Sequence, residues 1–244
     1  MIKDLPSALE YLNRDYPLNV SIIEPIGRNT AEVLYAAGDC VMIEDKLSNV
    51  VMLQTENVDL AEKLLDTLPK SVTHIVAHNE KLAVLVEKKL GYKKRVPCNQ
   101  AVYRGQPFEL ENRGLEIRPM TEEDAEEASA MYFGSVEEAL EHIRLGLVYA
   151  GVYNGNIACM IGRHVEGSMG QLVVKEEYRR KGFGEVMEKF LINTLIKRGL
   201  VPYCQVIVGN TASLNLQHKL GLEVSENKLY WMIKEKSSSS CGGN

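Results

Sequence analysis

Two periods in the pattern of apolar and polar positions divide the second half of the chain into predicted strands and helices. Strands are predicted where short apolar runs end at turn residues, at 115–118, 148–152, 157–163, 169–174, 203–208 and 229–233. Helices are predicted from caps and from apolar side chains that recur every three or four residues, at 121–132, 135–145, 184–198 and 212–220. The order is strand, helix, helix, three strands, helix, strand, helix, strand, which predicts a mixed α/β fold.

The first half contains a similar series of elements. The pattern predicts a helix within 1–16, a hairpin at 33–35 and 40–43, strands at 49–53, 73–77 and 96–103, and helices at 59–68 and 80–89. His74–Asn79 precedes a helix ending in Leu90-Gly91, and Gln205–Asn210 precedes one ending in Leu220-Gly221, 130 positions later. This similarity predicts an internal repeat. Chance similarity of two strand–helix units is the alternative.

The periodicity is interrupted between the two halves. Residues 105–114 contain two glycines and one proline and follow neither period. We therefore predict one domain at 1–104, a linker at 105–114, a second domain at 115–236 and a flexible serine- and glycine-rich tail at 237–244.

The strongest functional signal lies where the strand at 169–174 leads through a basic loop into the long helix. Gly182 and Gly184 stand at the start of that helix, directly after Arg179, Arg180 and Lys181. The first N–H groups of a helix lack intrahelical acceptors and, together with the helix dipole, attract anions. Glycine also lets a ligand approach the backbone closely. The pattern favours a diphosphate cradle, and a turn with solvated basic residues is the alternative.

The spacing Val174-x-x-x-x-Arg179-x-x-Gly182-x-Gly184 resembles the acyl-CoA signature of the GNAT superfamily of N-acyltransferases. The resemblance covers about residues 115–234, and the predicted order of elements there is the GNAT order. With the internal repeat, it implies a tandem GNAT-like fold of α/β class with a mixed sheet in two domains. A degenerate first domain resembles the glycine N-acyltransferase-like branch.

The first domain is not expected to bind CoA in the GNAT manner. After Leu53 it reads Gln-Thr-Glu-Asn-Val-Asp, with no glycine pair, no arginine, and acidic residues where a diphosphate would lie. Because like charges repel, this segment disfavours the ligand. The domain is expected to cover the sheet, shape the acceptor site or mediate pairing.

The resemblance implies acetyl-CoA as co-substrate and assigns its contacts. The amides of Arg180 to Glu185 would hold the pyrophosphate, and the main chain of Leu172 to Val174 would pair with the pantetheine arm. A second resemblance, at 210–222, implies that Asn210 and Ser213 contact the cofactor or stabilise the local structure. The predicted cofactor-binding residues are Leu172, Val173, Val174, Arg179, Arg180, Lys181, Gly182, Phe183, Gly184, Glu185, Asn210 and Ser213; no metal is expected.

Acyl transfer to an amine needs a base, a donor to the oxyanion and a proton for the leaving thiolate. By resemblance, the Val174 N–H would donate to the oxyanion. The family tyrosine that often acts as the acid is replaced here by Gln217, so Tyr203, His218 or water would supply the proton. The bases considered are His164, because histidine is the usual general base near neutral pH, and Glu166, although each is also typical of a solvated turn. The predicted catalytic residues are His164, Glu166 and Tyr203.

Composition restricts the partners. A formal net charge of −5, with 45% hydrophobic and 25% charged residues, is ordinary for a globular protein and gives nucleic-acid binding no support. No apolar run approaches the roughly 20 residues of a membrane span, no signal-peptide pattern is present, and the five cysteines lack metal or CxxC spacing. We expect a cytoplasmic monomer or homodimer without nucleic-acid or membrane partners.

The expected function is an N-acetyltransferase of the GNAT type. It would move an acetyl group from acetyl-CoA to a primary amine of a small molecule or amino acid, by direct attack in a ternary complex. A protein N-terminus or lysine is an alternative acceptor. The alternative function is a non-catalytic acyl-CoA-binding or interaction module, which Gln217 and the lack of an obvious base favour.

Overall fold

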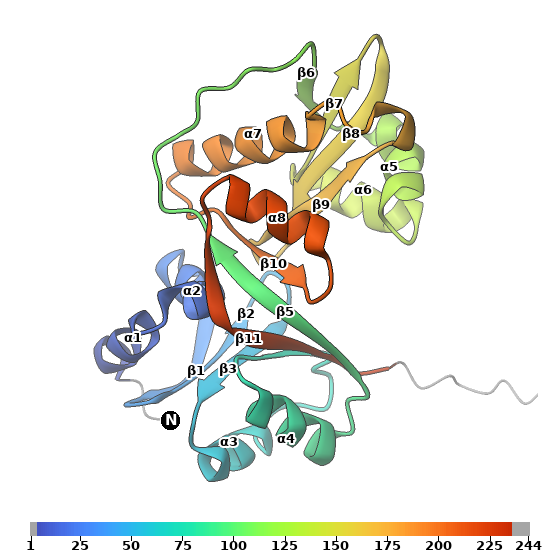
Figure 1. Cartoon of the computed structure of the whole chain (residues 1–244). Coiled ribbons are helices and arrows are strands. Elements are labelled where there is room, and N and C mark those ends of the chain that lie inside the picture. The colour runs from blue at the N-terminus through green and yellow to red at the C-terminus, as the bar shows by residue number, and fades with distance from the viewer. Residues whose placement is uncertain (1–3, 236–244) are drawn as a thin grey trace, which may run out of the picture. The chain divides into compact units, whose positions relative to one another are not determined.

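The computed structural model describes residues 4–235 and divides into two compact units (Figure 1). Unit 1 holds the described residues up to Asn99, Ile207–Gly209 and the residues from Ser225 onward. Unit 2 holds Gln100–Val206 and Asn210–Val224. The predicted boundaries at 1–104, 105–114 and 115–236 stay predictions. The predicted tail at 237–244 lies outside the described residues.

Unit 1 is a mixed sheet with helices on both faces. Its helices are α1 (Leu5–Asn13), α2 (Tyr16–Gly27), α3 (Val58–Leu65) and α4 (Glu80–Leu90). Its strands are β1 (Ala31–Ala37), β2 (Cys40–Asp45), β3 (Val50–Thr55), β4 (His74–Ala77) and most of β5 (Lys94–Val102) and β11 (Glu223–Ile233). They hydrogen-bond in the order β1-β2-β3-β4-β11-β5.

The core of unit 1 consists of two buried layers. Neighbouring residues of a strand point to opposite faces of the sheet. Met42 therefore shares a buried cluster with Leu82 of α4, whereas Ile43 shares another with Leu12 of α1. Helices α3 and α4 thus cover one face, and α1 and α2 cover the other.

The strands of unit 2 also form a mixed arrangement, and helices again cover both faces. Its strands are the end of β5, β6 (Glu116–Pro119), β7 (Val148–Tyr153), β8 (Asn156–Arg163), β9 (Met169–Val174) and β10 (Tyr203–Ile207), in the order β5-β10-β9-β8-β7-β6. Its helices are α5 (Ala125–Met131), α6 (Val136–Arg144), α7 (Phe183–Lys197) and α8 (Thr211–Lys219). Short 3-10 turns occupy Glu122–Asp124 and Glu176–Tyr178. Ile161 shares a cluster with Met187 of α7, and Met160 shares one with Ile143 of α6.

The predicted α/β class with a mixed sheet is confirmed. Each unit repeats the same final strand–helix step, in which Asn79 caps α4 and Asn210 caps α8. Each of these helices is followed by a glycine with positive φ, Gly91 at 71° and Gly221 at 77°. The repeat seen in the sequence is therefore a structural repeat.

Two details of the sequence interpretation require correction. Helix α2 was not predicted. Its start is capped by Asp15, which accepts the Leu18 N–H at 3.2 Å. Pro25 lies in its last turn, and proline in a sequence normally indicates that a helix ends. The strand at 229–233 comes last in the order predicted for the second half, which suggests that it joins the sheet of that half. Instead β11 pairs with β4 in unit 1, with Tyr230 opposite Ala77. The neighbour of β10 is β5, and Tyr103 donates its N–H to Pro202 O at 2.9 Å.

In unit 1, the parallel strands β3 and β4 pair as far as Leu53 and Ala77. Val51, Met52 and Leu53 face Ile75, Val76 and Ala77 in the ladder, and the His78 N–H donates to Leu53 O at 3.0 Å.

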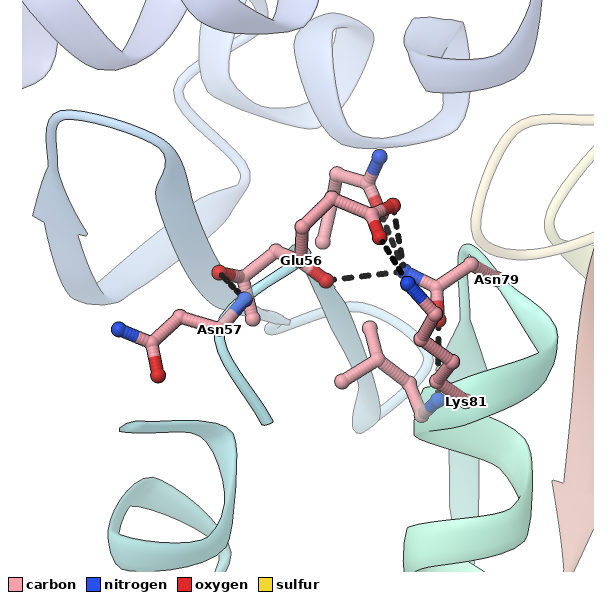
Figure 2. A network of polar contacts seen from close by, with 7 residues as sticks. Glu56, Asn57, Asn79 and Lys81 are labelled. Atoms are coloured by element: carbon pink, nitrogen blue, oxygen red, sulfur yellow. Dashed lines mark hydrogen bonds and ion pairs between the residues drawn. The ribbon is translucent and has the colours of Figure 1, made fainter. Parts of the chain in front are cut away.

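A polar network continues this closure beyond the strand ends (Figure 2). Asn79 Nδ2 donates to Thr55 O at 2.9 Å, and Lys81 Nζ donates to Glu56 Oε2 at 2.9 Å. Asn79 Oδ1 also accepts the Leu82 N–H at 2.9 Å and so caps α4. The network joins the two segments at the point where the acidic sequence disfavours a diphosphate.

We expect Asn79→Ala to destabilise unit 1 more than Lys81→Ala. The first change removes a helix cap and a bond to Thr55 O, which together contribute about 1–2 kcal/mol. The second removes an ion pair whose side chains are 67% and 57% exposed, and such pairs contribute about 0–1 kcal/mol. Urea unfolding followed by circular dichroism measures both changes. Equal midpoints for the two variants would contradict this account of the closure.

Candidate functional site

Unit 2 differs from unit 1 at the corresponding pair of parallel strands. Strands β9 and β10 pair in register at Met169 and Cys204 only. On its other side β9 stays paired with β8 as far as Val174, opposite Cys159. Among the described residues, the β10-facing edge of β9 beyond Met169 therefore has no ladder partner, and its main-chain groups can bind a ligand.

A bulge in β9 accompanies this divergence. Between two pairs of the β8–β9 ladder, β9 has one more residue than β8, and Gln171 there adopts φ 56°. The Gln171 side chain is 3% exposed and packs against Gly162 of β8, which has no Cβ in its way. Neither polar atom of the Gln171 amide has a hydrogen-bond partner within the described part of the chain. The bulge thus holds a strained residue directly before Leu172.

The start of α7 follows β9 and offers main-chain donors. Gly182 is the N-cap, adopts φ 81° and provides no side-chain cap. The first helical hydrogen bond runs from the Val186 N–H to Gly182 O at 3.2 Å. The preceding N–H groups of the helix therefore lack intrahelical acceptors. A Cβ on Gly184 would lie 3.7 Å from Val174 Cγ2, so this glycine faces the divergent end of β9.

Two of the three basic side chains before Gly182 are occupied by contacts within unit 2. Arg179 Nε donates to Val174 O at 3.4 Å. Lys181 Nζ lies 5.0 Å from the ring centre of Tyr153 and 5.8 Å from that of Tyr178. Arg180 is exposed and adopts φ 62°. The loop is thus basic, but Arg179 and Lys181 are held by these local contacts.

Glu185, in the first turn of α7, is neutralised by two lysines. Its carboxylate lies 2.8 Å from Lys189 Nζ and 2.6 Å from Lys219 Nζ. These hydrogen bonds lower the pKa of Glu185 to about 2. The carboxylate therefore stays charged at neutral pH, and its charge is balanced by the lysines.

The second signature segment forms the start of α8. Asn210 Oδ1 accepts the Ser213 N–H at 3.1 Å, so Asn210 caps the helix. Ser213 is half-buried one turn into α8. The predicted cofactor contacts of Asn210 and Ser213 stay predictions.

The three predicted catalytic residues lie around one turn, at residues 164–168. The His164 N–H donates to Ser168 O at 2.8 Å, and Ser168 Oγ donates to Glu166 Oε1 at 2.5 Å. The Tyr203 hydroxyl donates to Glu166 O at 3.1 Å. Glu166 and Tyr203 are buried, whereas His164 is only partly buried. The structure brings the three residues together, and their catalytic roles stay predictions.

An aromatic ring that the sequence analysis did not single out lies beside His164. Tyr132, 47% exposed at the end of α5, has its ring centre 6.4 Å from that of His164. Phe133 packs edge-on against Tyr132 at 5.4 Å and lies 4.8 Å from the ring of His142. Neighbouring aromatic residues between two predicted helices were the signal for this cluster. It provides flat apolar surface beside the candidate base.

Gln217, at the position of the family tyrosine, contacts a buried acid that the sequence analysis missed. Gln217 Nε2 donates to Glu188 Oε1 at 3.3 Å, and both residues are at most 3% exposed. Burial raises the pKa of Glu188 to about 7. Gln217 Oε1 has no partner among residues 4–235, and a protonated Glu188 could donate to it. The sequence spacing indicated this burial. Glu188 lies four residues after Gly184 and four before Ile192, so it shares the inward face of α7 with them.

The remaining expectations concern metal ligands, cysteines and membrane-spanning helices. Within residues 4–235 no cluster of three His, Cys, Asp or Glu side chains could hold a metal ion. The cysteines in that range, Cys40, Cys98, Cys159 and Cys204, are buried and free, and Cys241 lies outside it. No described helix combines the length and the apolar character needed to cross a membrane.

Comparisons with known proteins identify the fold. Residues 144–232 match the family model described as FR47-like protein. No curated protein sequence matches the chain significantly. A GNAT-family protein from Novosphingobium aromaticivorans superposes with a TM-score of 0.56 at 15% identity, covering 92% of this chain and 99% of that one.

Two further solved structures are similar over nearly the whole chain. A GCN5-related N-acetyltransferase-like protein from Streptococcus suis has a TM-score of 0.55 at 15% identity, covering 93% of this chain and 100% of that one. A GCN5-related N-acetyltransferase from Kribbella flavida has a TM-score of 0.55 at 10% identity, covering 90% and 96%. The chain thus has a tandem GNAT-like fold. The resemblance to the glycine N-acyltransferase-like branch stays a prediction.

We expect Glu188→Gln to remove one component of the pH dependence of stability. Folding raises the pKa of Glu188 from 4.5 to about 7, so the unfolded chain loses this proton first as the pH rises. The wild type should therefore lose about 3 kcal/mol of unfolding free energy between about pH 4 and pH 8 relative to the variant. Denaturant unfolding at several pH values measures this difference. Parallel pH profiles for the two proteins would show that Glu188 is not a buried acid.

Proposed function

We propose that unit 2 binds acetyl-CoA between β9 and β10 and transfers the acetyl group to a primary amine of a small molecule or amino acid. The observation that carries the proposal is the divergence of β9 from β10 beside the uncapped start of α7. An extended pantetheine arm needs main-chain partners along its length, and a diphosphate needs N–H donors. Both are available within a few residues of each other.

The predicted cofactor residues divide by role in this proposal. The main chain of Leu172 to Val174 pairs with the pantetheine arm. The amides from Arg180 to Glu185 hold the diphosphate, and Arg180 adds an exposed positive charge. Asn210 and Ser213 form the start of α8, where the cap at Asn210 keeps the helix in position. Acetyl-CoA is a substrate here, and the proposal includes no metal.

The reaction is a direct transfer. The nitrogen of a neutral amine attacks the thioester carbonyl carbon, a C–N bond forms, the C–S bond breaks, and CoA leaves as the thiol. The Val174 N–H donates to the oxyanion of the tetrahedral intermediate. The attacking nitrogen loses one proton to a base, and the thiolate gains one.

His164 is the first candidate for the base. Its ring is partly exposed and lies beside Tyr132, and histidine exchanges protons near neutral pH. The Glu166 carboxylate is buried and already accepts the Ser168 hydroxyl. The Tyr203 hydroxyl is buried and directed to Glu166 O, so its proton is engaged. The thiolate is therefore expected to take its proton from water or from His218, which is exposed on α8.

Release of free thiol from acetyl-CoA tests the proposed function. The full chain is incubated with acetyl-CoA and a panel of amines, amino acids and peptides. We expect at least one acceptor class to raise the rate clearly above the rate without acceptor. Tight binding of acetyl-CoA with no acceptor-dependent release across the panel would contradict the enzyme. It would favour the acyl-CoA-binding module, which Gln217 also favours because its amide cannot supply a proton to the thiolate.

We expect Gly184→Asp to weaken CoA binding without loss of stability. A Cβ at this position meets only Val174 and Leu172, at 3.7 and 3.9 Å, so the side chain fits. A carboxylate in the first turn is favourable for the helix dipole but repels a diphosphate at the same amides. The dissociation constant for CoA should rise at least about tenfold, or about 1.4 kcal/mol.

Gly184→Ala is the matched control, because it adds the same Cβ without charge. Its affinity for CoA should stay within about threefold of the wild type, and both variants should keep the melting temperature. Calorimetric titration and thermal unfolding provide these values. Unchanged CoA affinity in Gly184→Asp would show that the start of α7 does not bind the diphosphate.

A further inference from the structure

An arginine far from the signature lies directly over its first glycine. Arg113 lies in the segment that connects β5 to β6. A Cβ built on Gly182 would lie 3.0 Å from Arg113 Cζ and 3.3 Å from Arg113 Nε, so a side chain there would displace the guanidinium. Arg113 Nη1 also donates to Lys181 O at 3.5 Å. The guanidinium therefore occupies the space that Gly182 leaves empty.

The segment that carries Arg113 is attached to α7 and is not a free connection. Asn193 of α7 accepts the Phe108 N–H at 2.7 Å and donates to Phe108 O at 2.8 Å. Phe108 and Leu110 also pack against the apolar cluster that contains α7. The predicted linker at 105–114 thus follows the surface of the helix whose first turn offers the main-chain donors. Arg113 itself adopts φ 50°, a conformation that costs a non-glycine residue energy.

The charge of Arg113 is not neutralised within the described residues. No carboxylate there lies within ion-pair distance of its guanidinium, and the side chain is exposed. Arg179 and Lys181, the signature residues on either side of Arg180, are held by Val174 O and by two tyrosine rings. A guanidinium is planar and binds phosphate oxygens through two parallel N–H groups. Arg113 is thus the guanidinium positioned over the main chain at Gly182.

A cavity of about 520 Å³ gives a ligand room beside Arg113. Its lining includes Arg113 and three residues of the first turns of α7, Glu185, Val186 and Lys189. The negative charge of Glu185 is neutralised by Lys189 and Lys219. Glu109 and Glu111 also line the cavity, and their negative charges repel an anion. Lys189, the other cation of the lining, is paired with Glu185, so we expect an anion to contact Arg113.

We propose that Arg113 is a phosphate-binding residue of the acyl-CoA site, reaching the ligand across Gly182 from outside the signature. The inference rests on the proposed function, because the phosphate belongs to CoA. In this arrangement Gly182 has two roles. It lets the ligand approach the main chain, and it lets the Arg113 side chain reach the same place.

Calorimetric titration with CoA, dephospho-CoA and pantetheine tests the proposal on the full chain. Arg113→Gln should weaken CoA binding about fivefold to thirtyfold while pantetheine binding stays unchanged. If the weakening persists with dephospho-CoA, Arg113 contacts the diphosphate; if it disappears, Arg113 contacts the 3′-phosphate. Either result supports the proposal. Arg113→Lys should recover part of the affinity, because it restores charge without the paired N–H groups.

Arg104→Gln is the matched control. Arg104 precedes the same segment, is exposed, and lies 3.6 Å from Glu223, so its loss should leave CoA binding within about twofold. Equal CoA affinity for the wild type and Arg113→Gln would overturn the inference and leave the proposed function intact. An equal loss of pantetheine binding would also overturn it, because that loss would indicate a structural role. Absence of CoA binding by the wild type would overturn the inference and the proposed function together.

Discussion

Parallel strands in a buried sheet normally satisfy their main-chain groups along their whole length, and β9 and β10 do so at one point only. The bulge at Gln171 and the capless start of α7 both adjoin this opening. The opening is therefore the constraint on which the candidate site depends. It places unpaired strand groups, helix amides and the turn at 164–168 within one unit.

The two units show how one fold can be open or closed at the same place. In unit 1 the strands β3 and β4 pair as far as Leu53 and Ala77, and Asn79 and Lys81 extend the closure. In unit 2 the residue equivalent to Asn79, Asn210, keeps its capping role while the strands before it diverge. The local difference is a ladder that continues in one unit and stops in the other. At the corresponding helix start in unit 1, the Asn57 side chain caps α3 by accepting the Leu60 N–H at 3.0 Å, and the acidic Glu56 precedes this cap.

The sequence predicted the parts of this structure that follow from local patterns. Period and caps determine most elements, because each depends on residues close together in the chain. The position of β11 depends on pairing between distant segments, which periodicity does not encode. The bulge at Gln171 was also hidden, because glutamine rarely adopts positive φ. Arg113 and Glu188 could be recognised only when packing placed them beside Gly182 and Gln217.

Hydrogen exchange on the full chain, with and without acetyl-CoA, tests the central claim most directly. If the pantetheine arm pairs with β9, the amides of the peptide spanning 172–174 and of the first turn of α7 should exchange more slowly with the ligand. The corresponding strand of unit 1, β3, should be unaffected, because its edge is already paired. Protection at β3, or unchanged exchange at 172–174 under saturating acetyl-CoA, would contradict the account.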